Sequence, residues 1–213
     1  MDFNEIISNV KIYGLYESMV ASGYPMLINP YTPKDFCEQI DEIDNIDLIG
    51  ETIIENNNTK RAVNLASTNI GEGHDNFLNG VIIQFDLKFT VKAWTEAERY
   101  HFLDFVSSMS SMHRLTKMDY DKVFCSYVTE NIKNEMKRLL TEYNNNPCED
   151  TRLALLYNCP VGLQLTARMT TNYRQLKTIY RQRKNHALPE WKTFCKWVET
   201  LPWSELIIAN TNK

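Results

Sequence analysis

The chain has 213 residues, of which 43% are hydrophobic and 23% charged, and its formal net charge is −4. This composition excludes a disordered or strongly basic chain and fits one sizeable core, so we expect a single domain over residues 1–213. No stretch reaches the roughly 18 apolar residues of a membrane span, and no basic leader precedes an apolar run, so we expect a cytoplasmic protein without membrane contact. The five cysteines lack C-x-x-C spacing, which indicates buried thiols in a reducing compartment.

The first half of the chain has one clear pattern. Residues 10–15 predict a short strand, and residues 33–40 predict a helix capped by Thr32, whereas residues 43–71 are ambiguous. Apolar side chains then alternate with polar ones from Val81 to Val91, which predicts a long strand with one buried face.

A helix is expected next, over residues 94–112, because apolar residues recur at helical spacing. Its polar stripe holds Ser107, Ser110, Ser111 and, if the helix continues, Arg114. Hydroxyls and a guanidinium on one helix face can hold a phosphate, although small residues on a helix also allow a close contact with another helix.

The second half predicts further helices over residues 120–143, 149–157, 175–185 and 189–200, with a strand over residues 161–169. Helices and strands follow one another without a regular βαβ rhythm. We therefore expect an α+β fold, with mixed helices packed on an antiparallel sheet.

Positive charge is concentrated between Asp150 and Glu190, where no acidic residue occurs. The cationic residues of this segment are Arg152, Arg168, Arg174, Lys177, Arg181, Arg183 and Lys184. Such a cluster in an acidic chain predicts a localised anionic ligand, and it makes binding along a nucleic acid less favoured.

Helical pitch places Asn172, Leu176, Ile179 and Arg183 on one stripe. The two apolar residues turn this stripe toward the core, so Arg183 is drawn inward, where it needs a counter-charge. A bound anion would supply that charge. The alternative is an ion pair between Arg183 and a carboxylate such as Glu190, with the other cations solvated.

Other chemistries have weaker support. The four histidines show no metal-ligand spacing, and no P-loop or serine elbow is present, so we expect no metal site. Aromatic residues near the basic segment could stack on bases, but at helical spacing they are more often part of a core. They are Tyr173, Tyr180, Trp191 and Trp197.

Several of these residues together resemble a known family. Cys159-Pro160, a strand, Asn172-x-Arg174-x-Leu176, Arg183 eleven residues after the Asn, and His186-Ala187 with Glu190 follow one another in fixed order. This run resembles the carboxy-terminal signature of the flavin-dependent thymidylate synthases. His74, the alternating strand and Arg99 are similar to that family's earlier motifs, and the resemblance covers about residues 71–202, leaving residues 1–70 unassigned.

The resemblance implies a homotetramer with FAD and a deoxyuridine-type nucleotide such as dUMP at subunit interfaces. Methylene-tetrahydrofolate and NADPH would be co-substrates. It assigns cofactor binding to His74, Arg99, His101, Asn172 and Thr178. It assigns substrate binding to Arg174 and Arg183 and makes Arg183 the catalytic residue beside the flavin. Ser107, Ser110 and Arg114 are added as substrate-binding residues because of their predicted shared helix face.

The chain departs from the family at several charged positions. The Arg-His-Arg motif appears as Arg99-Tyr100-His101 with Met109 at the serine position, or one residue later with Ser110 there. Ser107 or Ser108 replaces an acidic residue, Leu156 an arginine, and Leu188 a glutamine. Each unreplaced charge-assisted bond costs about 1.5–3 kcal/mol of binding. Ser107, Ser110, Ser111, His113 and Arg114 could rebuild the phosphate site nearby.

Two hypotheses follow. The first is a divergent enzyme of this family that methylates or otherwise modifies a pyrimidine nucleotide with FAD. The second is a catalytically inactive member of the fold that binds a nucleotide or a partner protein.

Overall fold

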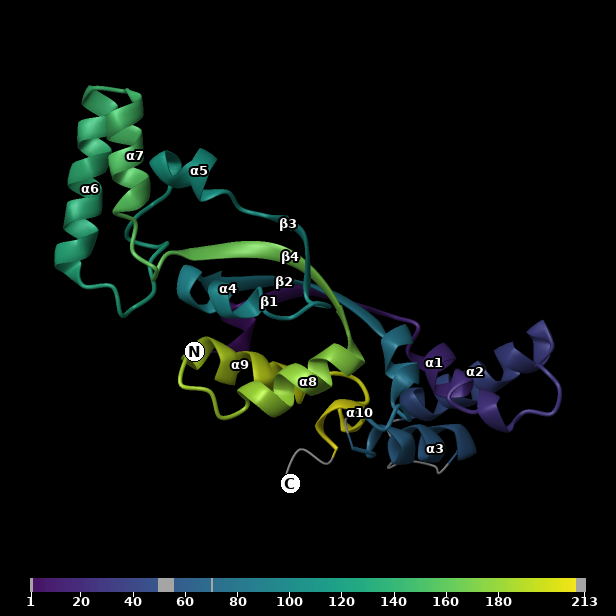
Figure 1. The fold of residues 1–213 in the computed structure, drawn as a ribbon. Helices are drawn as coiled ribbons and strands as arrows, with labels where there is room; N and C mark the ends of the chain where they lie inside the picture. Colours follow the sequence, from purple (N-terminus) through teal and green to yellow (C-terminus); the bar gives the residue numbers. More distant parts are fainter. Residues whose placement is uncertain (1, 50–55, 70, 210–213) are drawn as a thin grey trace.

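A four-stranded antiparallel sheet forms the centre of the molecule, with strand order β1-β2-β4-β3 (Figure 1). The strands are β1 (Ile7–Tyr13), β2 (Ile82–Thr90), β3 (Asp104–Ser108) and β4 (Gln164–Asn172). The computed structural model describes residues 2–49, 56–69 and 71–209. The expected α+β class with helices on an antiparallel sheet is confirmed.

Strand β2 provides the main buried face, as its alternation predicts. Ile83, Phe85, Leu87 and Phe89 are fully buried, and β2 pairs with β4 from Ile82 opposite Asn172 to Thr90 opposite Gln164. Helices α8 (Tyr173–Arg183) and α9 (Pro189–Val198) cover this face. The ring of Phe85 lies 4.7 Å from that of Trp197.

The aromatic residues of the basic segment therefore belong to the core. Tyr173 and Trp191 are fully buried, and Trp197 and Tyr180 are 4% and 8% exposed. Stacking on bases is not their role in this structure, because their rings pack against other core side chains.

The amino-terminal helices lie at one end of the sheet (Figure 1). They are α1 (Leu15–Ala21), α2 (Pro33–Ile49) and α3 (Asn57–Ala66), with α10 (Glu205–Ile208) packed against α3 and α8. The Thr32 hydroxyl accepts a hydrogen bond from the Asp35 amide, so the predicted cap is present, but α2 runs past residue 40. The ambiguous region thus contains the end of α2 and all of α3; residues 50–55 and 70 lie outside the described residues.

Helices α6 (Glu130–Asn145) and α7 (Glu149–Tyr157) form a hairpin at the opposite end (Figure 1). They surround a second apolar cluster, distinct from the sheet core, which includes Leu115, Tyr120, Phe124 and Leu155. We call this hairpin with residues 115–128 the helical lobe. The lobe meets the sheet through the bridge between Phe124 and Leu163.

The predicted helix over residues 94–112 is wrong. Helix α4 (Val91–Ala97) starts directly after β2, where the Thr90 hydroxyl accepts a hydrogen bond from the Ala93 amide. The chain then forms β3, whose side chains are all exposed, and the short helix α5 (Ser111–Arg114). Edge strand β3 is held by backbone pairing with β4, a long-range contact that local apolar spacing does not indicate.

The predicted helix over residues 120–143 is wrong in its first half, because α6 begins at Glu130. Tyr120, Phe124 and Val128 are buried in the helical lobe, but they lie in a loop. Their spacing of four residues imitates a helix, and this explains the error. Within the described residues, no helix is both long and apolar enough to cross a membrane.

Candidate functional site

Helix α8 begins at the carboxyl end of β4, and Asn172 joins the two elements. Its side-chain oxygen accepts a hydrogen bond of 2.8 Å from the Gln175 amide, so Asn172 is the N-cap of α8. Leu176 and Ile179 face the core, as the predicted stripe requires. Asn172 itself is half-buried, and its side chain hydrogen-bonds to the backbone of α8. The helical spacing of residues 172–183 did not predict this capping role.

Arg183 is buried at the other end of α8, with 9% of its surface exposed. Its Nη1 donates to a Glu96 carboxylate oxygen at 2.8 Å, and its Nε donates to the Tyr100 hydroxyl at 2.7 Å. The guanidinium also lies 4.9 Å from the centre of the Trp191 ring. Arg183 thus pairs with a carboxylate, as the alternative interpretation proposes, but that carboxylate belongs to Glu96.

Glu190, the partner that the sequence suggested, instead accepts a hydrogen bond from the Thr90 hydroxyl at 2.7 Å. Burial alone raises the pKa of Glu96, but the hydrogen bond from Lys92 and the charges of His186 and Arg183 bring that pKa below its ordinary value. His186 Nε2 lies 3.1 Å from the same carboxylate. Glu96 is therefore the charged centre of a group of three basic side chains.

Three of the six remaining cations of the basic segment also have carboxylate partners. Lys177, whose side chain is 3% exposed, donates to Asp75 at 2.9 Å and to the Ala66 carbonyl at 2.6 Å. Arg174 Nε lies 3.2 Å from the other oxygen of Asp75, and Arg168 pairs with Asp86 at 3.2 Å.

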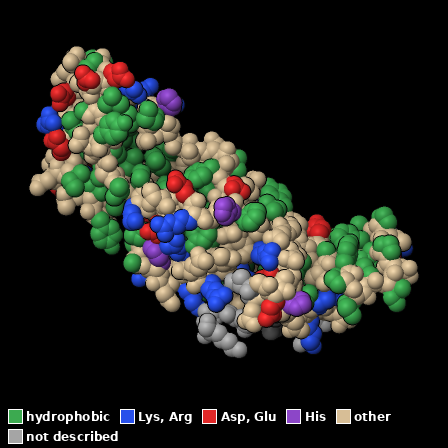
Figure 2. Space-filling model, in the orientation of Figure 1, with side chains coloured by type: hydrophobic (Ala, Val, Ile, Leu, Met, Phe, Trp, Pro, Cys, Tyr) green, Lys and Arg blue, Asp and Glu red, His purple; other side chains and the backbone are tan. Residues whose placement is uncertain are grey.

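Three carboxylates from residues 75–96 thus pair with four of the seven cations and neutralise part of the positive charge of this segment. On the face shown in Figure 2, Lys and Arg form separate small groups and make no continuous basic surface. Proximity in sequence did not reveal these partners, which lie more than 80 residues away.

A cleft lies between α8 and the residues that follow α4, and we call it the α8 cleft. Its volume is 380 Å³. It is lined by Arg99, Tyr100, His101, Phe102, Gln175, Thr178, Gln182 and Arg183. It brings together four of the predicted site residues: Arg99, His101, Thr178 and Arg183. Sequence reasoning did not assign Phe102 or the two glutamines to a site.

The α8 cleft has free polar groups as well as paired ones. Arg99 and His101 are exposed, and neither forms an ion pair with a described residue. Phe102 is 62% exposed, which leaves its ring open to a flat ligand. The Tyr100 hydroxyl accepts from Arg183 and lies 3.0 Å from the Gln182 side-chain oxygen, to which it donates.

The predicted phosphate-binding serines do not share a helix face, because that helix is absent. Ser107 lies exposed on β3, whereas Ser110 caps α5 by accepting a hydrogen bond from the His113 amide at 3.3 Å. Ser110 and Arg114 line a surface hollow of 590 Å³ together with His113 and Lys117. This α5 hollow shares no lining residue with the α8 cleft, so the structure separates Ser110 and Arg114 from Arg183.

His74 and Arg174 lie at a third place, near the start of α8. His74 is exposed in the turn before the 3-10 helix η3 (Asn76–Gly80). Its neighbour Asp75 forms the ion pair with Arg174, and neither His74 nor Arg174 lines the α8 cleft.

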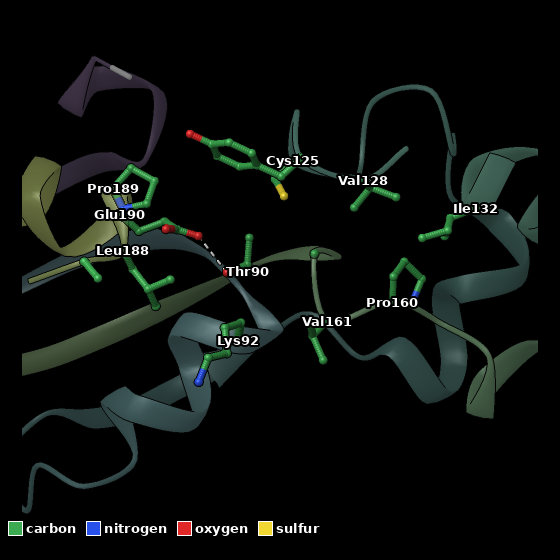
Figure 3. Close-up of a pocket in the computed structure, with 13 residues that line it drawn as sticks. Thr90, Lys92, Cys125, Val128, Ile132, Pro160, Val161, Leu188, Pro189 and Glu190 are labelled. Carbon is green, nitrogen blue, oxygen red and sulfur yellow. Dashed lines mark hydrogen bonds between the residues drawn. The ribbon is translucent and has the colours of Figure 1, made fainter. Parts of the chain in front are cut away.

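A further pocket, of 490 Å³, separates the helical lobe from the sheet core (Figure 3). We call it the interlobe pocket. Sequence motifs include three of its residues, Pro160, Ala187 and Glu190, but no pattern in the sequence predicts a cavity there. Among the described residues, no group of three or more His, Cys, Asp or Glu is arranged to hold a metal ion.

Comparison with known proteins gives a structural likeness only. No protein-family model matches the sequence, and no curated protein matches it. Two solved structures of flavin-dependent thymidylate synthase ThyX from Helicobacter pylori, each with FAD and dUMP, have a similar fold. One has a TM-score of 0.65 at 15% identity and covers 95% of this chain and 98% of its own. The other has a TM-score of 0.58 at 18% identity and covers 85% and 95%. The chain therefore has a ThyX-like fold.

Proposed function

We propose that this protein is a divergent relative of the flavin-dependent thymidylate synthases that binds FAD and a deoxyuridine-type nucleotide, and that modifies the pyrimidine. One observation carries the proposal. Arg99, His101 and Arg183 come from distant parts of the sequence and match motif positions of that family, and together with Thr178 they line a single cleft. The ThyX-like fold, whose solved examples hold FAD and dUMP, supports the same ligands.

The side chains of the α8 cleft suit a ligand with both a phosphate and a flat ring. Arg99 offers a guanidinium without a carboxylate partner among the described residues, and guanidinium groups bind phosphate oxygens bidentately. The exposed ring of Phe102 can stack on a base or a flavin. Gln175, Thr178 and Gln182 supply neutral hydrogen-bonding groups along α8. FAD, when bound, supplies hydride-transfer chemistry.

The volume of the α8 cleft indicates whether one chain alone can enclose FAD. At 380 Å³ it lies near the lower end of the roughly 300–1,000 Å³ typical of small-molecule pockets. FAD is a long dinucleotide, so this cleft holds one part of it. We propose that further copies of the chain complete the site, in the expected tetramer, and that NADPH and methylene-tetrahydrofolate serve as co-substrates.

Arg183 lines the cleft while its Nε and Nη1 are bonded to Tyr100 and Glu96. A guanidinium carries five N–H donors, so these two bonds leave others for a ligand. Its role in the proposal is to orient the pyrimidine and to polarise it, and the aromatic and carboxylate partners hold the guanidinium in place for that role.

The second candidate function is nucleotide or partner-protein binding without catalysis. Glu96 favours it, because this carboxylate neutralises Arg183 and thereby weakens the attraction of Arg183 for an anion. Leu156 also favours binding without catalysis, because it replaces an arginine of the family and so removes a positive charge.

The two functions are separated by flavin binding and turnover. The purified protein is reconstituted with FAD, its absorbance is recorded, and its thermal unfolding is measured with and without dUMP. The proposal expects bound flavin, a higher Tm with dUMP and product from dUMP with the co-substrates. Nucleotide binding without turnover establishes the second candidate, and failure to bind either FAD or dUMP rejects both ligand assignments.

A further inference from the structure

The interlobe pocket is built from two parts of the chain that approach each other across the end of the sheet. Thr90, Lys92, Leu188, Pro189 and Glu190 come from the side of the sheet core (Figure 3). The opposite wall comes from the helical lobe and from residues 160–162, and it is almost wholly apolar. These residues are Cys125, Tyr127, Val128, Ile132, Pro160, Val161 and Gly162.

The rim of this pocket exposes large apolar side chains to water. Tyr127 is 80% exposed, Val161 60% and Ile132 42%. Single exposed apolar residues are common, but three around one cavity give a ligand apolar surface to contact. The volume of 490 Å³ lies within the range of small-molecule pockets.

One carboxylate, that of Glu190, lies inside this apolar surface. Glu190 is 5% exposed and lies in the first turn of α9. Its Oε1 accepts the Thr90 hydroxyl hydrogen bond at 2.7 Å, which Figure 3 marks between the two side chains. Thr90 cannot turn away, because its oxygen also caps α4 by accepting from the Ala93 amide.

The other oxygen of Glu190 receives no hydrogen bond from the residues that the structure describes. Lys92, which also lines the pocket, does not supply one, since its ammonium lies 3.3 Å from Glu96 and points away from Glu190 in Figure 3. This second oxygen is not among the buried side-chain atoms that lack a partner, so it is open to the pocket, where a ligand with N–H groups can donate to it.

We propose that the interlobe pocket binds an aromatic amidine-type group, that is, a flat ring with two adjacent N–H donors. Its ring would pack against Val128, Pro160 and Val161, and its N–H pair would meet the Glu190 carboxylate in the bidentate geometry that carboxylates favour. The site is distinct from the α8 cleft, with which it shares no lining residue. The proposal therefore does not depend on flavin or nucleotide binding.

Benzamidine is the simplest probe of this class, and benzoate and benzyl alcohol are matched controls with the same ring. Binding to the full chain is measured by ligand-observed NMR and by calorimetry. We expect saturable binding of benzamidine at least tenfold tighter than that of either control. Equal affinity for benzoate overturns the role of the carboxylate, and absence of saturable benzamidine binding overturns the site.

Two substitutions locate the binding. Glu190→Gln keeps the Thr90 hydrogen bond and removes the charge, so it should weaken benzamidine binding at least tenfold. Glu199→Gln is the control, because Glu199 also accepts one hydroxyl hydrogen bond, from Tyr180, but lies outside the pocket. Unchanged affinity in Glu190→Gln overturns the proposal.

A third variant tests the pocket even if the buried Glu190 does not tolerate substitution. Val161 is an exposed rim residue, so Val161→Trp should block the cavity without disturbing the core. Cys125 gives an independent readout, because it lines the pocket and benzamidine should slow its modification by a small thiol reagent. Wild-type binding in Val161→Trp, or an unchanged rate at Cys125, places the ligand elsewhere and overturns the assignment.

Discussion

Two regions of this protein carry several basic residues, helix α8 and the segment of residues 99–117. They differ in whether their cations pair with carboxylates. On α8, Arg174, Lys177 and Arg183 each pair with a carboxylate from an earlier part of the chain. In the second segment, Arg99 and Arg114 are exposed and pair with no carboxylate among the described residues. These three cations of α8 therefore contribute mainly to the folded structure, whereas Arg99 and Arg114 are available to bind an anionic ligand.

The difference shows that a buried cation and an open one contribute to different properties. A buried cation depends on its carboxylate, so its loss affects the free energy of unfolding. An exposed cation adds little to stability but is free to meet a ligand. Substitutions in the two regions should therefore separate stability from binding.

The largest loss of stability is expected at Asp75. Asp75 is 1% exposed and holds the buried ammonium of Lys177. Asp75→Leu leaves that ammonium without its carboxylate, so the free energy of unfolding should fall by about 3–5 kcal/mol. Urea unfolding followed by circular dichroism measures the change.

The control for Asp75→Leu is Asp86→Leu, since the Arg168–Asp86 pair is about one-quarter exposed on each side. It should lose about 1 kcal/mol or less. A double variant, Asp75→Leu with Lys177→Met, should recover part of the stability because the fully buried ammonium is removed; Arg174, which also loses Asp75, is 35% exposed and stays partly hydrated. If Asp75→Leu and Asp86→Leu lower the free energy of unfolding equally, burial of the ion pair does not determine its contribution to stability.

A smaller loss is expected for Arg183→Ala. This change removes the hydrogen bonds to Glu96 and Tyr100 and the contact with the Trp191 ring. Glu96 keeps Lys92 and His186, so the free energy of unfolding should fall by about 2–3 kcal/mol, less than for an isolated buried pair. Stability equal to wild type, with nucleotide binding lost, would make Arg183 purely a ligand-binding residue.

The charge of Glu96 predicts a pH dependence. Because its folded-state pKa lies below the ordinary value of 4.5, its contribution to stability is complete above that pH and disappears as the pH falls through the folded-state pKa. Glu96→Gln should therefore be about 1.5–3 kcal/mol less stable than wild type at pH 7, with the gap closing below pH 4.5.

Urea unfolding at several pH values between 3 and 7 measures this gap. Glu98→Gln serves as the control, because Glu98 is exposed at the end of the same helix. A gap for Glu96→Gln that stays constant down to pH 3 argues against ionisation of Glu96 as its source.

The sequence predicts the fold class and the carboxy-terminal elements because their patterns are local. The alternation of β2, the apolar stripe of α8 and the proline at the start of α9 are each visible within a dozen residues. Strand β3 is not predictable in this way, since its five side chains are exposed and its backbone pairs with β4, which is distant in the sequence.

The candidate site was predictable only in part for the same reason. Motif positions indicate Arg99, His101 and Arg183, which the fold brings to one cleft together with Thr178. The carboxylate partners of the basic segment come from positions 75, 86 and 96, and no local pattern links them to it. The interlobe pocket likewise depends on how the helical lobe meets the sheet.

Arg99→Ala is expected to change the free energy of unfolding least among these variants. It should also weaken ligand binding most. Arg99 is exposed and has no carboxylate partner in the described part of the chain, so its loss should change the free energy of unfolding by about 0.5 kcal/mol or less. If Arg99 holds a ligand phosphate, losing that charge-assisted bond weakens binding by about 1.5–3 kcal/mol, or roughly 10- to 150-fold. Fluorescence titration with FAD and calorimetry with dUMP measure it.

Lys117→Ala is the matched control for Arg99→Ala, because Lys117 is an exposed cation that lines the α5 hollow and not the α8 cleft. If Lys117→Ala weakens binding of both ligands while Arg99→Ala does not, the phosphate site lies at the α5 hollow, where Ser110 and Arg114 would take the role that the α8 cleft has in the proposal. If both variants bind as wild type does, free surface charge does not mark the site. The contrast between paired and open cations would then describe stability alone.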